Sequence, residues 1–247
     1  MFWLGVAMMA VGFLGVLIGA KTKLQPVSLV SILVLLIGLG IYFHDFMSGD
    51  DGTMEIGKIY NCSISHRAGQ VMKKVAPGKK VLYIVGPNMV ESEFTKAAVE
   101  SFKAAYGSDD VVVATIEVTS DYEDGGMDMM SYLQPKHIDD LLADNPDAGV
   151  VVSDIGLPAK VNQLKCLALP EDKRPAFFLT GFGGASGKRI VNLIKNGKIT
   201  AIITGKSGKR DPDYEPSAKR LDEAFDKLYV VVDKDNLNEY KQELESY

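Results

Sequence analysis

Cysteine and histidine are scarce in this chain of 247 residues, which has two cysteines and three histidines. Cys62 and Cys166 belong to no Cys-x-x-Cys pair or Cys/His cluster, so the sequence offers no zinc site. No histidine has a plausible catalytic nucleophile beside it in sequence, which leaves no recognisable catalytic constellation. We therefore expect no metal and no cofactor, and we favour a non-enzymatic role. Cys166 lies in an apolar stretch and is expected to fill the core, while pairing of the two cysteines stays open.

Blocks of like charge and low-complexity segments are also missing. The net charge is −5, and the cations are scattered along the chain. Affinity for nucleic acid comes chiefly from neutralising phosphates with clustered cations. An acidic chain without such a cluster is a poor nucleic-acid binder, so we expect no nucleic-acid partner.

Long apolar runs, by contrast, are present near the start of the chain. Residues 2–20 carry no charge, and residues 27–43 are interrupted only by Ser28 and Ser31. At about 1.5 Å per residue, a helix of either length can cross a hydrocarbon core roughly 30 Å thick. Residues 21–26 are long enough only for a tight connection, and Pro26 suits the first turn of a helix. The sequence predicts a transmembrane helical hairpin over residues 1–45, with the lipid bilayer as its partner.

A cleaved signal peptide is the alternative for the first run. It would need a cation before the apolar stretch and a cleavage site after it. The chain has no such cation, and a second apolar run follows at once, which favours two retained spans. Lys21 and Lys23 are the only cations in the first 57 residues, and cations in short loops tend to stay cytoplasmic. We therefore expect the hairpin loop in the cytoplasm and the rest of the chain in an extracytoplasmic, or periplasmic, location.

After the hairpin, residues 46–78 have weak periodicity and are expected to be a juxtamembrane tether with one short helix at 67–74. From residue 79 to 247, apolar runs alternate with helical patterns. The expected strands are 79–86, 111–118, 149–155, 175–180, 199–204 and 229–232. The expected helices are 91–106, 135–143, 159–168, 187–195, 217–228 and 236–245. The pattern predicts an α/β domain with a doubly wound, mostly parallel, Rossmann-like sheet of about six strands.

In such sheets, ligands bind beyond the carboxyl ends of the strands. The candidate ligand-binding residues at these positions are Asn88, Ser153, Asp154, Thr180, Gly181, Phe182, Gly183, Gly184, Ser186 and Lys206. The glycine-rich loop at 181–187 precedes a predicted helix, where backbone N–H groups can bind an anion. It is not a Walker A loop, because Phe182 and Arg189 stand where glycine and Ser/Thr are needed. A structural strand-to-helix turn is the alternative reading.

Residues 152–158 resemble the phospho-acceptor strand of response-regulator receiver domains. Thr180 and Lys206 follow the next two strands, as that family's threonine and lysine do. Receivers hold magnesium with an acidic pair after the first strand, and this chain has Gly86-Pro87-Asn88 there. The metal would have too few oxygen ligands, which disfavours phosphotransfer.

A second resemblance covers nearly the whole predicted domain. Residues 79–106, 137–153, 190–203 and 228–240 are similar to strand and helix segments of type I periplasmic sugar-binding proteins. The resemblance implies a binding-protein lobe with a small sugar-like ligand. Those proteins close two lobes on the ligand, whereas this domain has room for about one. Phe182 is the clearest aromatic residue for stacking on a sugar.

The leading hypothesis is a membrane-anchored, extracytoplasmic, non-enzymatic binding or sensor domain. Its strand-end loops would take a small sugar-like or anionic ligand, or a membrane protein partner. One alternative is an enzyme or binder of a phosphorylated or nucleotide ligand that uses the glycine-rich loop. The other is a degenerate receiver-like or scaffolding domain of a membrane complex.

Overall fold

The computed structural model describes residues 51–116, 132–206 and 214–247, together with residues 8–11, 13, 16, 21, 30–37 and 39. The chain divides into two compact units, Met1–Gly57 and Lys58–Tyr247. The predicted span at 2–20 lies largely outside the described residues, and about half of the span at 27–43 does. Within the described part of the chain, no helix combines the length and the apolar character needed to cross a membrane.

The second unit is built on one six-stranded sheet. Its strands are β1 (Lys80–Val85), β2 (Val111–Thr115), β3 (Ala148–Ser153), β4 (Ala176–Leu179), β5 (Ala201–Gly205) and β6 (Tyr229–Asp233). Their spatial order is β2-β1-β3-β4-β5-β6. The first five strands run parallel to their neighbours, and β6 pairs antiparallel with β5. Each strand overlaps its predicted range, so the mostly parallel α/β sheet is confirmed.

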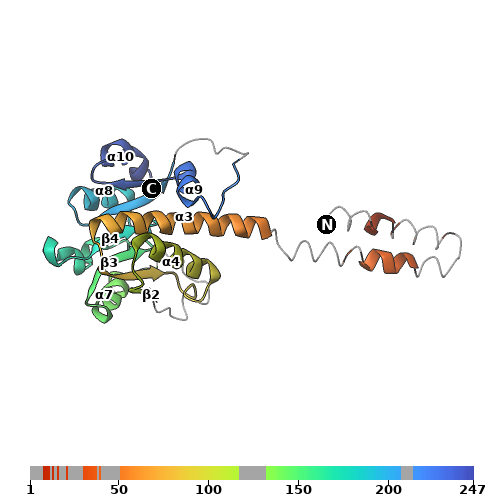
Figure 1. Cartoon of the computed structure of the whole chain (residues 1–247), viewed down its shortest axis with the longest axis horizontal. Coiled ribbons are helices and arrows are strands. Elements are labelled where there is room, and N and C mark those ends of the chain that lie inside the picture. The colour runs from red at the N-terminus through yellow and green to blue at the C-terminus, as the bar shows by residue number, and fades with distance from the viewer. Residues whose placement is uncertain are drawn as a thin grey trace. The chain divides into compact units, whose positions relative to one another are not determined.

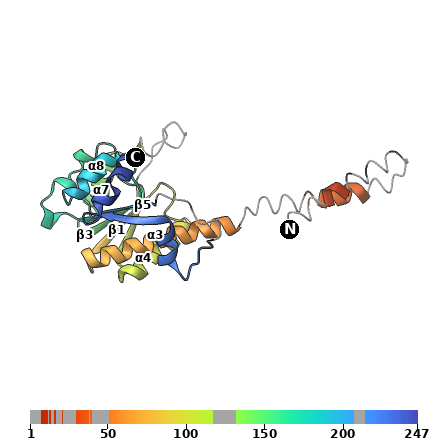
Figure 2. The same cartoon turned by 90° about the horizontal axis from the view of Figure 1, so that it is seen from above.

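Helices cover both faces of this sheet (Figure 1, Figure 2). One face packs against α7 (Pro135–Asp144), α8 (Gly187–Lys195) and α10 (Leu237–Glu245). The other packs against α3 (Asp51–Val75), α4 (Glu93–Tyr106) and α9 (Leu221–Leu228). Successive strand residues point to opposite faces, so strands covered on both sides need apolar residues throughout. This requirement explains the continuous apolar runs in the sequence.

Helix α3 replaces most of the predicted tether. It is one continuous helix of 25 residues rather than a short helix at 67–74. Ala68 and Met72 are fully buried against the sheet. At Gly69 the helix approaches α4 so closely that a Cβ would lie 2.6 Å from the carbonyl oxygen of Phe102. The buried face of α3 is made largely of small and polar residues, so its hydrophobic periodicity is weak in sequence.

Two buried tyrosine hydroxyls connect α3 to the rest of the unit. The hydroxyls of Tyr83 and Ser65 are 2.9 Å apart, and burial raises the pKa of Tyr83. The Tyr106 hydroxyl accepts from the Lys79 N–H at 2.9 Å and lies 2.5 Å from the Ala76 carbonyl oxygen. These bonds hold α3 and the turn that follows it in place.

The predicted helix at 159–168 is wrong. The connection from β3 to β4 contains three short 3₁₀ turns, at Val161–Gln163, Cys166–Ala168 and Glu171–Lys173. Leu164 and Leu169 separate these turns with extended backbone. Residues three apart share one side in a 3₁₀ turn as well as in an α-helix, so the apolar spacing alone did not distinguish the two.

Both cysteines are free in the structure. Cys166 is 6% exposed, in agreement with a core-filling role. Burial raises the pKa of its thiol to about 12, which leaves the thiol protonated and unreactive at neutral pH. Cys62 lies on α3 and is half-buried.

The helix crossing at Gly69 gives a direct test of the fold. We expect Gly69→Ala to lower the free energy of unfolding by about 1–2 kcal/mol, because the new methyl group meets backbone that cannot easily move. The matched control is Gly205→Ala, whose Cβ would have only the Leu228 carbonyl oxygen at 3.9 Å. Chemical denaturation of the full chain would measure both variants. Equal stability of the two would contradict the close crossing.

Candidate functional site

The carboxyl ends of β1 and β3 form the topological switch point of the sheet. The two strands are neighbours, yet the chain leaves them on opposite faces. After β1 it continues into α4, and after β3 it continues into the 3₁₀ connection, which packs on the other face. Ligands of open α/β sheets bind in the crevice that this divergence creates. Gly86-Pro87-Asn88 lies on the β1 side, and Asp154 lies on the β3 side.

Asp154 is held in a defined orientation at this point. The Thr180 hydroxyl donates to Asp154 Oδ1 at 2.6 Å. The Asp154 N–H donates to the Ile84 carbonyl at 2.8 Å, and the Thr180 N–H donates to the Ser153 carbonyl at 3.1 Å. Asp154 nevertheless remains exposed. One carboxylate oxygen is therefore fixed by the protein, while the group stays accessible as an acceptor for ligand hydroxyl or amine groups.

Ser153 has a supporting position rather than a place on the surface. Its side chain is fully buried, and its hydroxyl donates to the Gly156 carbonyl at 2.7 Å. Gly156 has a φ of +69°, so this short bond closes a tight turn directly after β3. Ser153 thus shapes the loop that presents Asp154.

The glycine-rich loop is ordered by backbone contacts with the loop after β3. The Leu157 N–H donates to the Phe182 carbonyl at 3.2 Å, and the Ala185 N–H donates to the Leu157 carbonyl at 3.0 Å. Gly183 has a φ of +63°, and a Cβ there would lie 2.6 Å from the Ile155 carbonyl oxygen. Close backbone approach therefore accounts for glycine at 183, as the structural-turn interpretation requires. Gly181 and Gly184 are half-buried in the same loop.

The far end of the loop contacts the last helix. A Cβ at Gly187 would lie 1.7 Å from the Leu244 carbonyl oxygen, so α8 begins directly against the end of α10. The Phe182 ring stacks on the Tyr247 ring, with centroids 4.5 Å apart and planes at 21°. The Phe182 ring, which was expected to stack on a sugar, thus already stacks on Tyr247. Ser186 precedes α8, is exposed, and makes no side-chain capping bond.

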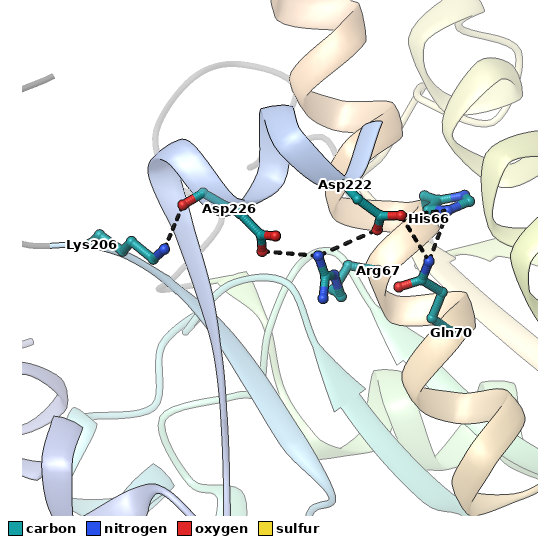
Figure 3. A network of polar contacts seen from close by, with 6 residues as sticks. All are labelled: His66, Arg67, Gln70, Lys206, Asp222 and Asp226. Carbon is teal, nitrogen blue, oxygen red and sulfur yellow. Dashed lines mark hydrogen bonds and ion pairs between the residues drawn. The ribbon is translucent and has the colours of Figure 1, made fainter. Parts of the chain in front are cut away.

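Asn88 and Lys206 are the first and the last residue, in sequence, of the predicted ligand-binding set. The Lys206 ammonium donates to the Asp226 carbonyl in the last turn of α9, as Figure 3 shows. Within the described residues it forms no ion pair with Asp154, so the receiver-like Asp/Lys arrangement is not assembled. Asn88 is exposed with a φ of +61°, a backbone conformation that asparagine tolerates better than most residues. The structure therefore brings Asp154 and Thr180 into contact and directs Lys206 elsewhere.

Sequence reasoning missed a polar network between α3 and α9 (Figure 3). Arg67 Nη2 donates to Asp226 Oδ1 at 2.9 Å and lies 3.3 Å from Asp222 Oδ1. The Arg67 guanidinium also lies 4.8 Å from the centroid of the Phe225 ring. Gln70 donates to Asp222 Oδ2 at 3.3 Å. The available signal was the three-residue spacing of Arg67 and Gln70, which places both on one side of a helix. The expectation of a tether at residues 46–78 obscured it.

No cluster of three His, Cys, Asp or Glu side chains suited to a metal ion occurs in the described part of the chain. At the carboxyl edge, Asp154 is an exposed carboxylate beside the Thr180 hydroxyl.

No family model matches the chain, and no curated protein matches it. Among solved structures, the arabinose-binding protein AraP of Geobacillus stearothermophilus is 17% identical, with a TM-score of 0.44, over 72% of this chain and 62% of that one. A sugar-binding protein of Bacillus halodurans is 14% identical, with a TM-score of 0.46, over 73% of this chain and 64% of that one. A solute-binding protein of Burkholderia graminis in complex with D-arabinose is 14% identical, with a TM-score of 0.44, over 73% of this chain and 62% of that one. The chain spans about three-fifths of the length of these proteins.

The structural role of Gly183 can be tested against its neighbour. We expect Gly183→Ala to cost about 1–3 kcal/mol of unfolding free energy, because alanine meets both an unfavourable φ and opposing backbone. Gly181→Ala should stay within about 0.5 kcal/mol, since its Cβ would have only an ordinary contact of 3.7 Å with the Asp154 carbonyl oxygen. Denaturant titration measures both. A tolerated Gly183→Ala would return the loop to the candidates for anion binding.

Proposed function

We propose that this chain is a membrane-anchored, extracytoplasmic, non-enzymatic binding domain that takes a small polyhydroxyl ligand at the β1/β3 edge. The observation that carries the proposal is the Asp154 carboxylate, exposed at the switch point and oriented by Thr180 at 2.6 Å. A fixed carboxylate accepts hydrogen bonds from ligand hydroxyls without reorganising, which favours binding. Asn88, exposed on the β1 side, supplies an amide that can donate and accept.

The charge of this edge favours a neutral ligand over a phosphorylated one. Asp154 is anionic, and the Lys206 ammonium donates to the end of α9. A phosphate placed beside Asp154 would be repelled by the carboxylate. The glycine-rich loop supports the same choice, because close backbone contacts account for Gly183, against residues 155–157, and for Gly187, against Leu244, without an anion. The absence of an opposing lobe from the described residues leads us to expect millimolar rather than micromolar affinity.

The membrane anchor and the location are part of this proposal. Two charge-free runs at 2–20 and 27–43, joined by a loop with Lys21 and Lys23, support a hairpin whose loop faces the cytoplasm. Helix α3 follows in sequence and belongs largely to the folded unit, which starts at Lys58. Residues 44–57 would then connect the second span to this unit.

The ligand prediction concerns Asp154. We expect the full chain, in lipid nanodiscs, to bind D-arabinose, D-glucose or D-galactose in calorimetric titration. Asp154→Asn should weaken binding about 10- to 100-fold, because it removes hydrogen bonds to a charged acceptor. Thr180→Val should weaken it less, because the carboxylate remains but is no longer held.

The matched control is Asp147→Asn. Asp147 is an exposed aspartate whose carboxylate accepts from Lys80 at 2.9 Å, at the amino end of the sheet. It should leave sugar affinity unchanged. Absence of binding by the wild-type chain at tens of millimolar sugar would overturn the proposed ligand, and equal effects of the two asparagine variants would overturn the site.

The topology prediction concerns Cys62. A membrane-impermeant maleimide should label Cys62 in intact cells after mild reduction, because this half-buried thiol would lie outside the cytoplasm. Cys62→Ser should abolish the signal, since Cys166 is only 6% exposed. Labelling that requires permeabilised cells would place the domain in the cytoplasm and refute the proposed orientation.

A further inference from the structure

A cavity lies on the flank of the domain, between α8 and the 3₁₀ connection that links β3 to β4. Its volume is about 250 Å³. Its apolar lining includes Val161, Leu164, Leu167 and Leu193. Val161, Leu164 and Leu167 are nearly fully buried, so this lining belongs to the core of the domain.

Two arginines, one near each end of the 3₁₀ connection, bond it to α8 and to the turn that follows α8. The Arg189 guanidinium on α8 donates to the Ala159 carbonyl, at the start of the connection. The Arg174 guanidinium, at the end of the connection, donates to the Gly197 carbonyl at 2.8 Å and to the Leu169 carbonyl at 3.2 Å. Both walls are therefore tied together by side-chain bonds to backbone, and the cavity is preformed.

The rim of the cavity is polar and positively charged. Asn192 on α8 and Asn196, the C-cap residue of the same helix, line it together with Asn162 from the connection. Arg189 and Lys198 also line it, and no carboxylate does so among the described residues. The Lys198 ammonium makes no hydrogen bond or ion pair with the described residues. An apolar wall with an amide and cation rim is complementary to an amphipathic anion.

We propose that this cavity binds a small organic carboxylate whose body is a single ring or a branched chain. A cavity of about 150 Å³ can hold benzene, so about 250 Å³ suits a ring with one substituent. The carboxylate would face Lys198 and the asparagine amides, which donate hydrogen bonds, while the apolar body would contact Leu164, Leu167 and Leu193. The site is separate from the β1/β3 edge and does not depend on the function proposed for that edge.

The test compares benzoate with benzyl alcohol, two probes of similar size and different charge. Calorimetric titration into the full chain in nanodiscs, with empty nanodiscs subtracted, should give benzoate at least about a fivefold advantage, as expected for one partly exposed charge-assisted contact. Lys198→Gln should remove most of this advantage and leave benzyl alcohol unchanged. Equal affinity of the two probes for the wild-type chain would overturn the proposal.

A second variant fills the cavity itself. Ala168 is exposed and lines the cavity, so Ala168→Trp should abolish binding of both probes without lowering the melting temperature. Gln163→Trp adds the same side chain at an exposed position of the connection outside the lining, and should bind both probes as the wild type does. Unchanged probe binding by Ala168→Trp would overturn the site. If the wild-type chain proves to be a dimer, its conversion to a monomer by Ala168→Trp would overturn the ligand in favour of a second copy of the chain.

Sugar titrations keep the two proposals distinguishable. Ala168→Trp should leave any response to D-arabinose intact, and Asp154→Asn should leave the response to benzoate intact. Loss of both responses in either variant would contradict the independence of the two sites.

Discussion

Coverage of both faces of the parallel sheet is the constraint on which the rest of this structure depends. Strands β1, β3 and β4 are apolar on both sides, so each face must be covered by helices. Helix α3 supplies a large part of one cover, and Gly69 lets it approach α4 closely enough to bury Ala68 and Met72. Without α3, Tyr83 and its neighbours on that face would be open to water.

The same sheet order creates the candidate binding edge. Because β1 and β3 are adjacent and their following segments diverge, the topological switch point of the sheet lies at their carboxyl ends. Short local bonds then determine which groups this edge presents. The buried Ser153 hydroxyl closes the turn after β3, and the Thr180 hydroxyl orients the exposed Asp154 carboxylate. A backbone-to-backbone contact at Gly183 supports this loop from the other side.

Polar side chains away from the β1/β3 edge mainly form bonds that connect one helix or loop to another. Arg67 connects α3 to α9 through Asp222 and Asp226, and Lys206 donates to the end of the same helix (Figure 3). On the opposite face of the sheet, Arg174 and Arg189 tie the 3₁₀ connection to α8. A cation at a helix C-terminus or on a backbone carbonyl satisfies an acceptor that lacks another donor. The bonds of Arg174 and Arg189 hold together the two walls of the cavity beside α8.

Much of the fold could be predicted because it follows from short-range patterns. The apolar strand runs and the alternation with helices determine an α/β sheet, and the position of Asp154 after β3 follows from chain order alone. The three-residue step from Val161 to Leu164 places both residues on one side of either a 3₁₀ turn or an α-helix, so the connection after β3 was misassigned. The weak periodicity of the small and polar residues of α3 concealed its buried face.

The sequence by itself therefore determined the class of sheet, its strand order in the chain and the set of residues near its carboxyl edge. Only the tertiary structure decided which of those residues meet. Thr180 reaches Asp154 across neighbouring strands, whereas Lys206 lies beside α9 and Phe182 is covered by Tyr247. The physical reason is that contacts between segments depend on the directions in which the chain leaves each strand, and no local pattern encodes those directions.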